Sequence, residues 1–264
     1  MNKFKYSILL LFIFLMPSCV PVKDLQYLQV KEGAAEMQTI NQVSLKPYRV
    51  QVNDNLVIKI KTSDPKLSEM FSVTNAGVNQ NLQSEEAIYF QGYNVDDHGN
   101  IRIPVLGEIN VLGFTLEEIR ITIEKRLLDE YFNKQADVFV AIKLGGIRYT
   151  INGEVASPGT NVLYQEKVSI IEAIANSGDI TMVGDRKNVV LIRQTPVGTE
   201  MHTLDLTDVA VLQSPYFYLQ PNDYILVNPL KQKSWGTGTT GIQSLSTIIT
   251  VLSLITSIII LTTI

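Results

Sequence analysis

The chain has 264 residues, of which 45% are hydrophobic and 18% are charged, with a formal net charge of −4. This is the composition of a folded protein, and a slightly acidic chain without a basic run excludes nucleic acid as an expected partner. Cys19 is the only cysteine, which excludes an intramolecular disulfide framework.

Residues 1–18 have the pattern of a secretory signal peptide. Two lysines precede nine unbroken apolar residues, 8–16, and Pro17-Ser18-Cys19 follows. Nine residues make a helix of only about 14 Å, too short to cross a bilayer of about 30 Å. The segment Met16-Pro17-Ser18-Cys19 resembles a bacterial lipobox, so we expect cleavage before Cys19 and lipidation of its thiol. The alternative is an ordinary cleaved signal followed by an incidental cysteine.

Residues 19–46 are mixed and Gln-rich without sustained periodicity, so they are expected to form a tether that leads away from the lipid. Val20 follows the cysteine at a position where Asp favours retention in the inner membrane of some bacteria. Its presence therefore favours the outer membrane.

A first β-rich unit is predicted over residues 47–144. Apolar and polar residues alternate from Tyr48 to Ile60, interrupted by the turn residues Asn53-Asp54-Asn55. Residues 62–88 are expected to be a long surface loop, and residues 96–100 (DDHGN) a tight turn. Alternation then resumes at Ile101, Ile103 and Val105, where Pro104 indicates an edge or bulged strand.

A helix and a strand complete this unit. Thr115 and Glu118 form a capping box, and four apolar residues then lie on one helical face: Leu116, Ile119, Ile123 and Leu127. Val138, Val140 and Ile142 alternate as the closing strand.

Residues 145–230 are predicted to form a second α+β unit. Strands are expected around Tyr149, around Val162, at residues 189–192 and at residues 224–227. Ser169 and Glu172 repeat the capping-box pattern and predict a short helix that Gly178 would end.

Two segments of the chain echo one another. VQVNDNLVI at residues 50–58 and YLQPNDYILV at residues 218–227 share a Gln, an Asn-Asp pair and a following apolar strand. Asn tolerates the left-handed conformation and Asp can cap its own turn, so each segment is expected to be a tight turn that begins a strand. The simpler explanation is that two unrelated turns use the same chemistry.

A membrane-spanning helix is predicted over residues 244–264, after a linker at 231–243. The last charged residue is Lys233, and these 21 residues are all Ile, Leu, Val, Ser or Thr. As a helix they would be about 31 Å long, which matches the hydrocarbon thickness. Trp235 precedes them, and its amphipathic ring is typical of a membrane interface.

Four hydroxyl residues of this helix recur on one face: Ser246, Thr250, Ser253 and Ser257. One interpretation is close helix packing in lipid, with each hydroxyl bonding back to a carbonyl one turn earlier. The other is a stripe that faces a water-filled lumen in a ring of identical helices. Both require helix–helix association, so oligomerisation is expected.

No catalytic, cofactor or metal site is predicted. The G-x-G-x-x-G pattern at residues 236–241 is followed by a lipid-type helix and lacks the later acidic residue that a dinucleotide site needs, so it is expected to be a flexible linker. His98 and His202 are the only histidines and do not form a metal-ligand cluster. Asp96 and Asp97 are the best candidates for paired carboxylates, but they are read first as part of a hairpin turn.

The order of these segments resembles the outer-membrane polysaccharide export family over about residues 48–230. YRVQVNDNLVIKI resembles the family's opening strand–turn–strand, and YNVDDHGNIRIPVLGEINVLGFTLEEIRITIEKRL its export-domain signature. GEVASPG, SIIEAIANSGD and VVLIR resemble a soluble-ligand-binding β-grasp domain. The family usually has Gly where this chain has Asn53 and Asn222, and a second Gly is common at Asp179. Asn can adopt the same left-handed turn.

The resemblance implies a lipid-anchored ring, often eight-fold, whose C-terminal helices build a barrel through the outer membrane. It implies polysaccharide cargo, outer-membrane lipid and an inner-membrane co-polymerase or kinase-type partner, with most of the chain in the periplasm. It also shifts the interpretation of Ser246, Thr250, Ser253 and Ser257 towards residues that line the lumen. Only one β-grasp unit is evident, whereas longer members of the family carry more.

The expected function is passive translocation of capsular or exopolysaccharide by a ring of subunits, without bond chemistry. A second hypothesis is a membrane-anchored glycan-binding or structural lipoprotein without a pore. A third is an envelope enzyme that acts on polysaccharide through a carboxylate such as Asp96 or Asp97. Glycan cleavage would favour the third, and glycan binding by monomers of residues 20–233 would favour the second.

Overall fold

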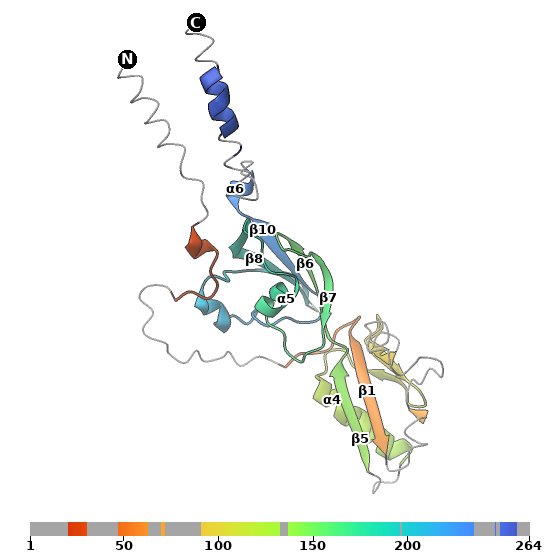
Figure 1. Cartoon of the computed structure of the whole chain (residues 1–264). Helices are drawn as coiled ribbons and strands as arrows, with labels where there is room; N and C mark the ends of the chain where they lie inside the picture. The colour runs from red at the N-terminus through yellow and green to blue at the C-terminus, as the bar shows by residue number, and fades with distance from the viewer. Residues whose placement is uncertain are drawn as a thin grey trace.

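The computed structural model describes residues 21–30, 47–62, 70–71, 91–132, 137–195, 197–234, 246 and 249–257. Within them the chain is a mixed α+β protein rich in β-sheet, as the sequence predicts. Two separate apolar cores divide the elements into a first unit that ends with β5 and a second unit that begins with β6 (Figure 1). The predicted surface loop at 62–88 lies almost wholly outside the described residues.

The first unit is a small antiparallel sheet covered by one helix. The sheet has the order β2-β1-β5, from Tyr93–Asn94, Asn55–Thr62 and Val138–Leu144, and the helix α4 (Leu116–Glu130) packs on β5 (Figure 1). Side chains alternate between the two faces of a strand, so every second residue of β1 and β5 turns towards the core. The buried residues of β1, β5 and α4 are Leu56, Ile60, Val140, Ile119, Ile123 and Leu127.

Helix α4 begins where the capping box predicts. The Thr115 N–H donates to Glu118 Oε2 at 2.7 Å, and the Glu118 N–H donates to Thr115 Oγ1 at 3.2 Å. These two bonds satisfy donors that the first turn of a helix leaves without intrahelical partners.

The strand predicted through Ile101, Ile103 and Val105 ends earlier than expected. The strand β3 (Asn100–Ile103) stops before Pro104, and Val105 has a φ of 69° and is exposed. The chain turns back into β4 (Gly107–Asn110), which pairs with β3 as an antiparallel hairpin. Proline has no N–H to donate to a ladder, so the strand ends there and Val105 belongs to the turn rather than to the apolar face.

The second unit is a five-stranded mixed sheet with the order β7-β6-β10-β8-β9. Its strands are β6 (Ile147–Gly153), β7 (Gly159–Leu163), β8 (Gly184–Thr195), β9 (Gly198–Leu204) and β10 (Asp223–Pro229). The central pair β6 and β10 is parallel, and every other pair is antiparallel. A short 3-10 helix, η2 (Val209–Gln213), lies in the connection between β9 and β10.

Helix α5 (Ile170–Asn176) buries Ile170, Ala173 and Ile174 in the core of this sheet. Its capping box is formed by Ser169 and Glu172, as predicted. Strand β9 was not predicted, because its residues are almost all exposed and its sequence shows no apolar alternation.

Residues 21–30 pack against the second unit, whereas the sequence predicts that they belong to a tether. The 3-10 helix η1 (Val22–Asp24) places Asp24 Oδ1 2.7 Å from the Lys187 ammonium on β8. The Leu28 and Gln29 N–H groups donate to the carbonyls of Leu206 and Thr207 at 3.1 and 2.7 Å. The segment lacks a periodic apolar face, and it is held by these backbone bonds and by Tyr27 and Leu28, which pack against the apolar core of the second unit.

The described C-terminal part comprises α6 (Lys231–Ser234) and a helical stretch at residues 249–257. Among the described residues, none belongs to a helix that is both long and apolar enough to cross a membrane. Most of the predicted spanning segment 244–264 lies outside the described residues.

Candidate functional site

The two echoing segments form the same kind of turn. In the first, the Asp54 N–H donates to the Gln51 carbonyl at 3.3 Å, and the Gln51 N–H donates to Asp54 Oδ2 at 2.8 Å. Asn53 has a φ of 68°, the left-handed conformation that the sequence predicts for it.

The second turn repeats this geometry residue by residue. The Asp223 N–H donates to the Gln220 carbonyl at 3.2 Å, the Gln220 N–H donates to Asp223 Oδ2 at 2.7 Å, and Asn222 has a φ of 67°. The two turns therefore share a hydrogen-bond pattern as well as a sequence. Asp179, at the third position where Gly is common in the family, also has a positive φ, 72°.

The buried carboxylates of the two turns have different partners. Asp223 accepts from both Arg193 Nε and Nη2, at 2.9 and 2.6 Å, in a forked ion pair. Asp54 Oδ2 instead accepts from the Tyr48 hydroxyl at 2.6 Å. Burial raises the pKa of Tyr48, and both carboxylates act in the same direction, so these groups form one polar cluster.

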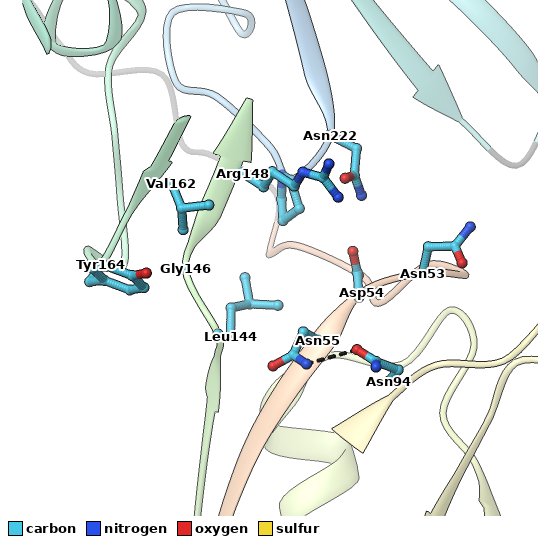
Figure 2. A pocket seen from close by; sticks show the side chains of 12 residues that line it. Asn53, Asp54, Asn55, Asn94, Leu144, Gly146, Arg148, Val162, Tyr164 and Asn222 are labelled. Atoms are coloured by element: carbon cyan, nitrogen blue, oxygen red, sulfur yellow. Dashed lines mark hydrogen bonds between the residues drawn. The ribbon is translucent and has the colours of Figure 1, made fainter. Parts of the chain in front are cut away.

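A pocket of about 130 Å³ lies where the two units meet (Figure 2). Only Gly145 and Gly146 link β5 to β6, and the Gly145 N–H donates to the Asn55 carbonyl at 2.7 Å. The first unit contributes Asn53, Asp54, Asn55, Asn94 and Leu144, and the second contributes Arg148, Val162, Tyr164, Pro221 and Asn222. The two echoing turns thus face one another across this pocket.

Two buried acceptor atoms of residues in the pocket wall have no donor among the described residues: Asp54 Oδ1 and Asn55 Oδ1. Asp54 is only 1% exposed, and both of its hydrogen bonds go to Oδ2. The Asn55 amide donates to Asn94 Oδ1 at 2.7 Å, the bond drawn in Figure 2. A buried acceptor without a donor costs about 1–3 kcal/mol, so these two atoms lower the stability of this part of the fold.

Burial raises the pKa of Asp54, against the opposing effect of the Gln51 N–H and the Tyr48 hydroxyl. Since this pKa is higher in the folded state than in the unfolded chain, the protonated carboxyl favours folding. The stabilising contribution is complete below the unfolded pKa of about 3.9 and is lost as the pH rises through the folded pKa.

The variant Asp54→Asn tests this, because the amide keeps the acceptor oxygen of the turn and does not ionise. We expect the wild type to gain stability relative to Asp54→Asn as the pH falls from 8 towards 4. Urea unfolding midpoints of both proteins across this range measure the difference. A difference between the two midpoints that stays constant with pH would contradict the raised pKa of Asp54.

The site residues predicted from sequence lie elsewhere. Cys19 is outside the described residues. Thr250, Ser253 and Ser257 are in the helical stretch, where their hydroxyls donate to carbonyls of the same helix at 2.8 to 2.9 Å. Such back-bonding occurs whether the stripe faces a neighbouring helix or water, so both interpretations stay open for Ser246, Thr250, Ser253 and Ser257.

The alternative of Asp96 and Asp97 as paired carboxylates gains no support. Asp96 Oδ1 accepts from the His98 and Asn100 N–H groups at 2.9 and 2.8 Å, which makes it the cap of the predicted turn. Within the described ranges, no three His, Cys, Asp or Glu side chains are grouped so as to hold a metal ion.

The pocket residues Asn94, Arg148 and Tyr164 were not singled out from the sequence. Each is an ordinary surface type in its local context, and only the approach of the two units brings them together. The repeated Gln-x-Asn-Asp pattern was the one available signal, because it marks the two turns that meet there.

Comparison with known proteins agrees with this organisation. Residues 42–143 match the family model described as polysaccharide biosynthesis/export protein, and residues 148–227 match the SLBB domain. The chain belongs to the polysaccharide biosynthesis/export family. The matched family is one of export proteins rather than of enzymes, in agreement with the expectation from sequence.

Two curated relatives carry the name EPS I polysaccharide export outer membrane protein EpsA. The protein from Ralstonia nicotianae (strain ATCC BAA-1114 / GMI1000) is 30% identical over 149 residues, and that from Ralstonia solanacearum is 27% identical over 151 residues. Each match covers 56% of this chain and 39% of the relative. The chain therefore matches well under half the length of these relatives.

Proposed function

We propose that this chain is a subunit of an oligomeric outer-membrane channel that exports capsular or exopolysaccharide. The observation that carries the proposal is the match of both family models in sequence, export region first and SLBB domain second, across residues 42–227. The two relatives are named as export proteins of the outer membrane, which supports the same location for this chain.

The proposed anchors are the lipid on Cys19 and the helix at 244–264. The described segments next to these two anchors support the proposal that both anchors enter the same membrane. The helix η1 contacts β8 through Asp24 and Lys187, while α6 follows β10 and Lys233 pairs with Glu154. Both segments lie at the end of the second unit remote from the first (Figure 1). Two anchors that enter one bilayer hold a protein far more firmly than one acyl chain does.

In this arrangement the second unit lies next to the outer membrane and the first unit extends into the periplasm. The polymer would be made and pushed from the inner membrane, where a co-polymerase or kinase-type partner is implied by the family. The helices of a ring, eight subunits by resemblance, would enclose the lumen with Ser246, Thr250, Ser253 and Ser257 facing it. Hydroxyls suit this position because they contact a hydrated glycan without binding it tightly.

Electron microscopy of single particles tests the architecture. The full-length protein, extracted in mild detergent, is compared with a version truncated after Lys233. The expected result is a ring with a central lumen that narrows to a helical barrel, and a barrel that disappears on truncation. A monomer or a small closed bundle would remove the lumen and leave the second hypothesis, a membrane-anchored glycan-binding or structural lipoprotein without a pore.

A further inference from the structure

We propose that two opposite faces of the first unit join neighbouring copies of this chain head to tail. The open face of the sheet in one copy would receive the outward face of helix α4 from the next copy. This inference rests on the proposed function for the existence of the ring, and it adds which surfaces of the chain close that ring.

The first of the two surfaces is the side of the sheet turned away from α4. Side chains alternate along a strand, so the residues between the buried positions of β1 and β5 turn outward. The strand register puts three cross-strand pairs on this face: Val57 with Lys143, Lys59 with Ala141, and Lys61 with Phe139. Phe139 is 62% exposed, so no described part of the same chain covers this end of the face.

This sheet face is hollowed where the two units meet. A groove of about 520 Å³ lies there, and its lining includes the outward residues Val57, Lys59 and Ala141. The second unit contributes Tyr164 and Glu166, from the segment that follows β7. A groove with apolar residues in its lining and charged residues beside them fits a convex partner, and an amphipathic helix is the convex element that such grooves receive.

The second surface is the outward side of α4. The helix buries Ile119, Ile123 and Leu127 against its own sheet. A step of two residues turns a side chain by about 200°, so Ile121 points away from that core. Ile121 is 52% exposed. Contact between the two surfaces would remove both Ile121 and Phe139 from water, which favours association.

The charges of the two surfaces are complementary. The charged residues within β1 and β5 are all lysines: Lys59, Lys61 and Lys143. The exposed charged residues of α4 are mainly acidic, with Lys125 as the exception: Glu117, Glu118, Asp129 and Glu130. Opposite charges across an interface favour the matching partner, and like charges suppress the wrong one.

This charge pattern selects a head-to-tail contact. Two sheet faces brought together would oppose lysines to lysines, and two helix faces would oppose carboxylates to carboxylates. Some of the carboxylates already pair within α4, as Glu117 does with Arg120. In contrast, Lys59, Lys61 and Asp129 form no ion pair within the described part of the chain, so they can pair with the opposite face of a neighbouring copy.

The position of the two surfaces suits a closed ring. A contact between two different faces of identical subunits generates a ring when the rotation from one copy to the next closes. Helix α4 packs on one side of β5, and the groove residues belong to the other side of the same small sheet (Figure 1). Both surfaces therefore belong to the first unit, so each copy can contact one neighbour through the helix and the other through the sheet.

A pair of cysteines in the full-length protein tests this contact. Within one copy Ile121 and Phe139 lie on opposite sides of the sheet and helix layers, so a bond between Ile121→Cys and Phe139→Cys joins two copies. The double variant, oxidised or treated with a flexible bismaleimide in detergent, should give a ladder of covalent dimers and larger species on a non-reducing gel. Each single variant should match the wild type, because head-to-tail contact never brings a face to its own copy.

Charge reversal is a second measurement that does not depend on an exact distance. Lys59→Glu combined with Lys61→Glu should lower the mass of the detergent-extracted particle to that of one or two subunits, as measured by mass photometry. Adding Glu117→Lys and Asp129→Lys on α4 should restore the larger particle. The matched control is Arg102→Glu, an exposed base on β3 outside both surfaces, which should leave the particle unchanged.

The outcomes separate this contact from the channel. A wild-type ring that survives the lysine reversal, together with a cysteine pair that gives no ladder, would overturn this proposal and retain the channel. Cross-linking of Phe139→Cys alone beyond the wild-type level would overturn it in favour of a twofold contact. A ladder from the double variant without a lumen in micrographs would retain this contact and remove the channel. A wild type that is monomeric in every measurement would overturn both.

Discussion

Replacement of Arg193 by methionine is expected to destabilise the second unit by about 3–5 kcal/mol, because it leaves a buried carboxylate without its counter-ion. The side chains of Arg193 and Asp223 are 7% and 0% exposed. Arg193 also donates from Nη2 to the Tyr218 carbonyl at 2.9 Å. Burial raises the pKa of Asp223 and the guanidinium opposes that rise, so its removal would push the carboxyl further towards protonation.

Urea unfolding of the full-length protein, followed by circular dichroism, measures this loss. The matched control is Lys143→Met, which breaks an ion pair with Glu166 whose side chains are 71% and 81% exposed. An exposed pair of this kind contributes about 0–1 kcal/mol because water screens it. If the two variants lost equally little, the Arg193–Asp223 pair would not be the stabilising contact of the second turn.

Replacement of Ser253 by tryptophan is expected to abolish export almost completely while membrane insertion persists. In a ring every subunit places the same residue at the same level, so one substitution adds a bulky ring to the lumen once per subunit. Insertion should persist because tryptophan is tolerated in a membrane helix far better than a charge is. The measurement is polymer at the cell surface, together with the amount of the protein in the outer-membrane fraction.

The matched control for this variant is Ile255→Trp. Two residues along a helix correspond to a rotation of about 200°, so Ile255 lies nearly opposite Ser253 and would face lipid. This control should export at normal levels. Normal export by Ser253→Trp as well would assign the stripe to helix packing and would remove the lumen from this face.

The local devices of this fold were predictable from the sequence. Thr115 with Glu118, and Ser169 with Glu172, begin helices where their spacing predicts. Asn53 and Asn222 adopt the left-handed conformation at positions where the family usually has glycine. Each depends on atoms within a few residues of chain, so its energy is encoded in the segment that forms it. The family could be recognised because these devices occur in a specific order.

Predictions from local sequence pattern were wrong where contacts between residues distant in the sequence decide the structure. Val105 continues an apolar alternation but belongs to a turn, since Pro104 ends the ladder. Strand β9 has no apolar face, and its hydrogen bonds to β8 are what define it. Residues 21–30 look like a tether and are instead held by backbone bonds to residues 206–209, which are far away in the sequence.

The sequence by itself therefore determined the order of the two units, their helix starts and their two matching turns, because short-range sterics and hydrogen bonds act within each segment. Only the tertiary structure decided that the turns at Asp54 and Asp223 face one another and that Arg148 and Tyr164 join them around a pocket. It also left Asp54 Oδ1 without a donor in the part of the chain that the structure describes. The physical reason is that hydrogen-bond satisfaction in a pocket between two units depends on groups brought from five different segments, and no local pattern records which of them will meet.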